Sequence, residues 1–96
     1  MKMVIVTYNE AIDVEVMEVL DGCGLANYTK VTRVFGKGKT SGTHLGSQVW
    51  PGLNYILYVA CEDTQVKQLV LGITNLRKTL GREGVKAFVM PLEQIT

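Results

Sequence analysis

The sequence feature that most restricts the folds open to this chain is the order in which strand-like and helix-like segments alternate along it. Short β-branched or apolar stretches, each predicted to form a strand, occupy Lys2–Tyr8, Tyr28–Phe35, Leu53–Cys61 and Val85–Leu92. Stretches with apolar residues at helical spacing lie between the first two of these and between the last two. The order is therefore β-α-β-β-α-β, in a chain of 96 residues that has room for a single domain, residues 1–96.

The predicted helices also have recognisable ends. Asn9 can cap the first helix, because its side-chain oxygen can accept from a free amide of the first turn, and Gly22 and Gly24 can end it. The second helix opens at Glu62-Asp63-Thr64 and ends within Gly81–Gly84. Four acidic residues along the first helix are expected on its solvated face: Glu10, Asp13, Glu15 and Glu18.

Two right-handed crossovers of this kind fold into one antiparallel four-stranded sheet with both helices on one face. The predicted class is thus α+β, with the ferredoxin-like βαββαβ arrangement. The strands are apolar on both sides, as Ile56 and Tyr58 beside Leu57 and Val59 illustrate. Because the helices can cover only one face, the second apolar face predicts an oligomer.

Composition excludes several classes of protein. The formal net charge of +1 gives no general attraction to nucleic acid or to anionic lipid, so neither is expected as a partner. No apolar run approaches the ~18 residues of a membrane span, and the apolar N-terminus is better explained as a strand than as a signal peptide, so we expect a cytoplasmic protein without membrane insertion. Cys23 and Cys61 lack metal-ligand spacing and are expected to be structural.

The most distinctive segment is the glycine- and lysine-rich stretch that follows the second strand. It begins Gly36-Lys37-Gly38-Lys39-Thr40, where glycines let backbone amides converge on an anion and two lysines add positive charge. It is not a Walker A loop, because Arg33 stands where the first glycine belongs and a strand follows instead of a helix. From this chemistry alone, an anion site and a plain solvated loop both remain open.

No arrangement of residues typical of catalysis accompanies this stretch. His44 has no acidic or cysteine neighbour at ligand spacing, and no Ser-His-Asp set or paired carboxylates occur. We therefore expect no catalytic residues, no metal ligands and no enzymatic activity.

Two segments carry a family resemblance. Val31–Gly42 resembles the entry to the long T-loop of PII signal-transduction proteins, and Gly81–Val89 resembles their B-loop, with Lys86 matching a phosphate-binding lysine. The resemblance implies a homotrimeric regulator that binds a small anionic ligand, ATP, ADP or AMP, between subunits and has no other cofactor. It also implies signalling to a membrane transporter or a metabolic enzyme through residues 36–52. The ligand-binding residues would be Gly36, Lys37, Gly38, Lys39, Thr40, Gly84 and Lys86.

The sequence also departs from this family. Its T-loop segment is short and has no tyrosine between Gly36 and Asn54, so uridylylation is not expected, and Glu83 and Val85 interrupt a normally glycine-rich turn. The chain ends at Thr96 without the arginine-bearing tail of the family's nucleotide site. Two alternatives stay open: a protein-interaction module without a small ligand, and a CutA-like metal-tolerance trimer.

Overall fold

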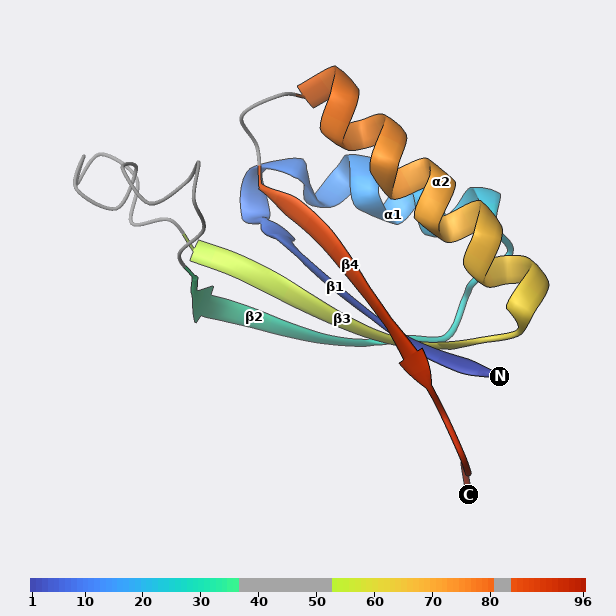
Figure 1. Cartoon of the computed structure of the whole chain (residues 1–96). Coiled ribbons are helices and arrows are strands. Elements are labelled where there is room, and N and C mark those ends of the chain that lie inside the picture. Colours follow the sequence, from blue (N-terminus) through green and yellow to red (C-terminus); the bar gives the residue numbers. More distant parts are fainter. Residues whose placement is uncertain (37–52, 81–83) are drawn as a thin grey trace.

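The computed structural model describes residues 1–36, 53–80 and 84–96, and they confirm the predicted βαββαβ order (Figure 1). The elements are β1 (Lys2–Asn9), α1 (Asp13–Gly22), β2 (Thr29–Phe35), β3 (Leu53–Cys61), α2 (Asp63–Leu80) and β4 (Val85–Pro91). A short 3-10 turn, η1 (Glu10–Ile12), precedes α1. The α+β, ferredoxin-like class is therefore confirmed.

The start of the first helix differs from its prediction. Asn9 does act as a cap, but its Oδ1 accepts from the backbone N of Ala11, only two residues on, at 2.8 Å. This bond caps the 3-10 turn η1, which the backbone N–H of Asp13 closes by donating to the carbonyl of Glu10, and α1 itself begins at Asp13. At the other end of α1, Gly24 adopts a φ of 71°, the left-handed conformation that glycine tolerates best.

The four strands form one sheet in the order β2-β3-β1-β4, with every neighbouring pair antiparallel. A bulge separates Val31 from Val34 in β2, and Arg33 within it has a φ of 59°. Pro91 ends β4 at the sheet edge, as predicted, where its missing N–H removes no bond from an internal ladder.

Both helices cover the same face of the sheet (Figure 1). A Cβ atom on Gly72 of α2 would lie 2.5 Å from Cγ1 of Val19 in α1, so this glycine lets the two helices approach closely. The buried side chains between the helices and the sheet are Val4, Val6, Tyr8, Ile12, Val16, Leu20, Leu25, Leu57, Val59, Cys61, Leu69, Ile73 and Val85. Cys61 is thus a core thiol, as expected, and it and Cys23 are both free.

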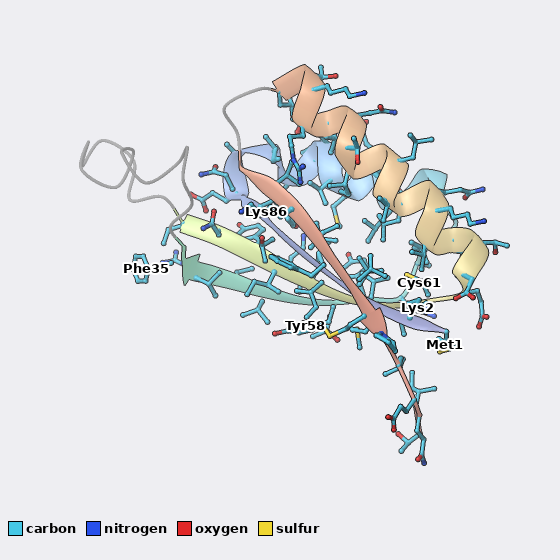
Figure 2. All side chains as sticks on the ribbon, in the orientation of Figure 1. Met1, Lys2, Phe35, Tyr58, Cys61 and Lys86 are labelled. Atoms are coloured by element: carbon cyan, nitrogen blue, oxygen red, sulfur yellow. The ribbon has the colours of Figure 1, made fainter. Side chains whose placement is uncertain are left out.

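The face of the sheet that no helix covers is apolar, as predicted. We call it the open face, and its apolar side chains, grouped by strand register, are Met3, Ile5, Val31, Ile56, Tyr58, Ala60, Phe88 and Met90. Tyr58, Phe88 and Met90 are 40%, 49% and 39% exposed. Figure 2 shows Tyr58 on the side of the sheet away from both helices. Large apolar side chains exposed on one face of a sheet are typical of an association surface.

Candidate functional site

Two of the predicted binding segments reach the same end of the sheet. Asn9 pairs with Asn54 across β1 and β3, and the backbone N–H of Asn9 donates to the carbonyl of Gly84 at 3.1 Å. Gly36 follows the last residue of β2 and lies against Asn54. We call the group Gly36, Asn54, Asn9 and Gly84 the glycine end of the sheet.

Gly36 is held in close contact with the neighbouring strand. A Cβ atom at this position would lie 2.5 Å from Nδ2 of Asn54. Any larger residue would therefore displace the Asn54 amide from the place where β2 ends and the 37–52 segment begins. The glycine predicted for backbone approach to an anion is thus also required by the packing of the sheet end.

Lys86 lies at the other edge of the same sheet end, in β4. It pairs with Thr7, so its side chain leaves the sheet on the open-face side, and it is exposed. Figure 2 labels it near the start of β4, far from Lys2 and Cys61 at the opposite end. Within residues 1–36, 53–80 and 84–96, no carboxylate pairs with the Lys86 ammonium.

Gly36 and Lys86 do not meet within one chain. Their strands are the two outer ones in the order β2-β3-β1-β4, three strand spacings apart. At about 4.8 Å a spacing, the two strands that carry them are about 14 Å apart. The structure therefore brings together Gly84 and Lys86 but leaves Gly36 at the far edge. Lys37, Gly38, Lys39 and Thr40 lie outside the described residues, as does His44.

A polar cluster below the glycine end corrects one expectation. Asp13 does not lie on a solvated helix face: it accepts from the Tyr8 hydroxyl at 2.5 Å and from Nζ of Lys30 at 2.9 and 3.1 Å. The Lys30 ammonium also lies 5.5 Å from the centre of the Tyr55 ring, close enough for a cation–π contact. The cluster ties β2 and β1 to the start of α1.

The protonation states in this cluster suit a structural role. Burial and the bond to Asp13 raise the pKa of Tyr8 far above its ordinary value, so the phenol stays neutral. Burial alone would raise the pKa of Asp13, but the hydrogen bonds from Lys30 and Tyr8 and the charge of Lys30 outweigh it and lower that pKa. Neither group titrates near neutral pH, which does not favour acid–base catalysis here.

The described residues can also be compared with the requirements of a metal site and of a membrane span. In the described part of the chain, no three His, Cys, Asp or Glu side chains lie together in a way that could hold a metal ion. Burial raises the pKa of both Cys23 and Cys61, which keeps the thiols protonated. None of the described helices is long and apolar enough to span a membrane.

Three residues of this region had not been predicted as part of a site. Asn54 fills the space beside Gly36, Asn9 holds the carbonyl of Gly84, and Arg77 of α2 holds the carbonyl of Val85. Asn9 had a local signal, but only as a helix cap. Asn54 and Arg77 contact residues that no spacing rule connects to them.

Comparison with known proteins gives the family. Solved structures of CPII from Thiomonas intermedia K12 share the fold: the form bound to ADP, AMP and acetate is 17% identical with a TM-score of 0.68, and the form bound to ADP and bicarbonate is 19% identical with a TM-score of 0.68. Each alignment covers 97% of this chain and 88% of the CPII chain. No curated protein matches the sequence significantly. The family model described as Nitrogen regulatory protein P-II, however, matches residues 1–96, so this chain belongs to the P-II family.

Proposed function

We propose that this protein is a homotrimeric P-II regulator that binds an adenine nucleotide between subunits, at the glycine end of the sheet. Proteins of this family are regulatory, form trimers and bind nucleotides. The nucleotide would set the state of residues 36–52, which would signal to a membrane transporter or a metabolic enzyme.

The observation that carries this proposal is the separation of the two site halves. Gly36 and Lys86 lie at the same end of the sheet but on opposite outer strands, about 14 Å apart. A single phosphate group cannot contact both within one chain. A second copy that brings its own β2 edge beside β4 would complete the site, which supports a ligand bound between subunits.

The open face supports the same assembly. Tyr58 and Phe88 flank Ile5 in one register row, Met90 lies in the row of Met3, and each of the three is about two-fifths or more exposed. Burying such apolar surface stabilises an assembly by about 25 cal/mol per Å² before the cost of association is subtracted. A second and a third copy of this chain are the simplest occupants of this face.

The ligand class follows from charge and from the solved relatives. Lys86 offers an unpaired ammonium among the described residues, which suits a phosphate group. CPII has been solved with ADP and AMP, and with ADP and bicarbonate. ADP is therefore the first ligand to test, and bicarbonate in the presence of ADP is the second.

One observation favours a second candidate function, a protein-interaction module without a small ligand. Phe35, the last residue of β2 and the neighbour of Gly36, is 79% exposed (Figure 2). A large aromatic side chain in this position suits contact with another protein. Nothing in the described residues favours the CutA-like metal alternative.

Calorimetric titration with ATP, ADP and AMP tests the proposal on protein whose mass is known from light scattering. We expect a trimer that binds ADP saturably, and a Lys86→Ala trimer that binds it about ten- to hundredfold more weakly, the effect of losing one charge-assisted bond. Lys67→Ala removes an equally exposed lysine from the N-terminal half of α2 and should leave binding unchanged.

Each failure has its own meaning. A trimer that binds none of the three nucleotides would overturn the ligand and favour the interaction module. A monomer that binds ADP would overturn the site between subunits. Equal losses in the Lys86 and Lys67 variants would remove Lys86 from the site.

A further inference from the structure

Arg77, in the last turn of α2, holds the backbone from which Lys86 projects. Its Nε and Nη2 atoms both donate to the carbonyl oxygen of Val85, at 3.2 and 3.0 Å. That carbonyl belongs to the peptide bond joining Val85 to Lys86. A fork of two donors on one oxygen fixes the orientation of this peptide group.

The strand register leaves the Val85 carbonyl without a bond to β1. Because the N–H of Asn9 bonds to the carbonyl of Gly84, the opposed pair Tyr8 and Val85 has its backbone groups pointing away from each other. The Val85 carbonyl therefore faces the outer edge of β4, where the sheet has no further strand. The guanidinium of Arg77 occupies that edge.

Two successive peptide groups before Lys86 are thus fixed from opposite sides. Asn9 of β1 holds the Gly84 carbonyl from inside the sheet, and Arg77 of α2 holds the Val85 carbonyl from outside. Val85 itself is 2% exposed and anchored in the core. The Lys86 side chain is long and exposed, so the position of its Cα decides where its ammonium can reach.

On the basis of the proposed function, we propose that Arg77 is a positioning residue of the anion site: it fixes the start of β4 so that Lys86 projects toward the ligand. Arg77 acts here through the backbone, without touching the ligand. Lys78, its neighbour in the same turn, carries the same charge and makes no such bond among the described residues.

The test is a cycle of variants titrated with ADP. Arg77→Met keeps most of the apolar stem and removes the fork, and Arg77→Lys keeps the charge but cannot form the fork. We expect both to weaken ADP binding about tenfold, the low end of the effect of removing a partner that orients a binding residue. Lys78→Met, the matched loss of charge, should bind ADP as the unchanged protein does.

The cycle is closed in the Lys86→Ala background. If Arg77 acts by positioning Lys86, Arg77→Met should weaken ADP binding little further once Lys86 is absent. Hydrogen exchange without nucleotide gives a second readout: in Arg77→Met, the amides of residues 84–87 should exchange faster while those at the centres of β1 and β3 keep their protection.

Three results would overturn the inference. Arg77→Met and Lys78→Met could lose the same affinity, which would indicate a long-range effect of charge. Arg77→Met could lose as much affinity with Lys86→Ala as without it, which would indicate independent roles. Unchanged exchange at residues 84–87 would show that Arg77 does not fix this backbone. Failure of the unchanged protein to bind ADP would instead overturn the proposed function, and the site that Arg77 would position with it.

Discussion

Removing the carboxylate of Asp13 should destabilise the protein mainly through the tyrosine that it leaves behind. Asp13 accepts from the Tyr8 hydroxyl at 2.5 Å and from Lys30 at 2.9 Å, and Tyr8 is only 1% exposed. In Asp13→Ala the buried hydroxyl loses its partner, at a cost of about 1–3 kcal/mol. The partly exposed ion pair with Lys30 adds about 0.2–1 kcal/mol, so we expect a total loss of about 1–4 kcal/mol.

Tyr8→Phe, measured alone and in the Asp13→Ala background, isolates the contribution of the Tyr8 hydroxyl. Tyr8→Phe alone removes one hydrogen bond to a carboxylate that still has Lys30 and water, so it should lower the free energy of unfolding by about 1 kcal/mol. In the Asp13→Ala background the same change removes an unpaired buried hydroxyl, so it should raise the free energy of unfolding by about 1 kcal/mol. The sign of the effect of Tyr8→Phe therefore reverses.

Urea unfolding followed by circular dichroism, at one fixed protomer concentration, measures all four proteins. Glu15→Ala is the control, because Glu15 is the other acidic residue in the first turn of α1; it should change stability by less than about 0.5 kcal/mol. If Tyr8→Phe destabilises both backgrounds equally, the Tyr8–Asp13 bond is not the source of the stability, and the reasoning fails.

Three further predictions concern pH, helix packing and assembly. Because the pKa of Asp13 is lowered in the folded protein, its contribution to stability is present above the unfolded pKa of about 4 and is lost as pH falls through the folded pKa. The urea midpoints at pH 6 and pH 3 should therefore differ more for the unchanged protein than for Asp13→Asn. Equal differences in the two proteins would contradict this. Gly72→Ala should lower stability by about 1 kcal/mol, since overpacking against Val19 outweighs the gain in helix propensity. In the Val19→Ala background, where there is room for the new methyl group, Gly72→Ala should raise stability instead. The same urea assay would show no reversal if the two helices can simply separate. Phe88→Asp should convert the proposed trimer to monomers in light scattering, whereas Leu71→Asp should not, because Leu71 is a 62% exposed residue of α2. A trimer that survives Phe88→Asp would remove the open face from the interface.

Local signals in the sequence predicted the fold well, because each acts over a few residues. The β-branched runs gave all four strands, and the glycines after α1 marked its end. The turn η1 was not predicted. The residue type of Asn9 indicates a cap, but the kind of turn that follows depends on which backbone amide the Asn9 side chain reaches. Asp13 was wrongly expected on a solvated face, since its partner Lys30 lies 17 residues away and is brought near only by the folded sheet.

In the candidate site, too, only the residues marked by a local motif were predicted. Gly36, Gly84 and Lys86 were named from short motifs, and the described residues place all three at one end of the sheet. Asn54 and Arg77 were not, because an asparagine beside a glycine and an arginine at a helix end have no meaning until strand register and helix packing are known. Residue type thus indicates what can bind an anion, and the register decides which residues support it.

The strand order adds a constraint that neither motif contains. In a sheet ordered β2-β3-β1-β4, the segments before β4 and after β2 always leave from opposite edges, so residues at the two loop bases cannot close on one small ligand within a chain. Both helices lie on one face of this sheet (Figure 1), so the other face, which is apolar, stays uncovered. Further copies of this chain could bring the two site halves together and could also cover the open face. Assembly and ligand binding are then one problem, and a variant of the open face that prevents assembly should abolish ADP binding even though it leaves Gly36 and Lys86 intact.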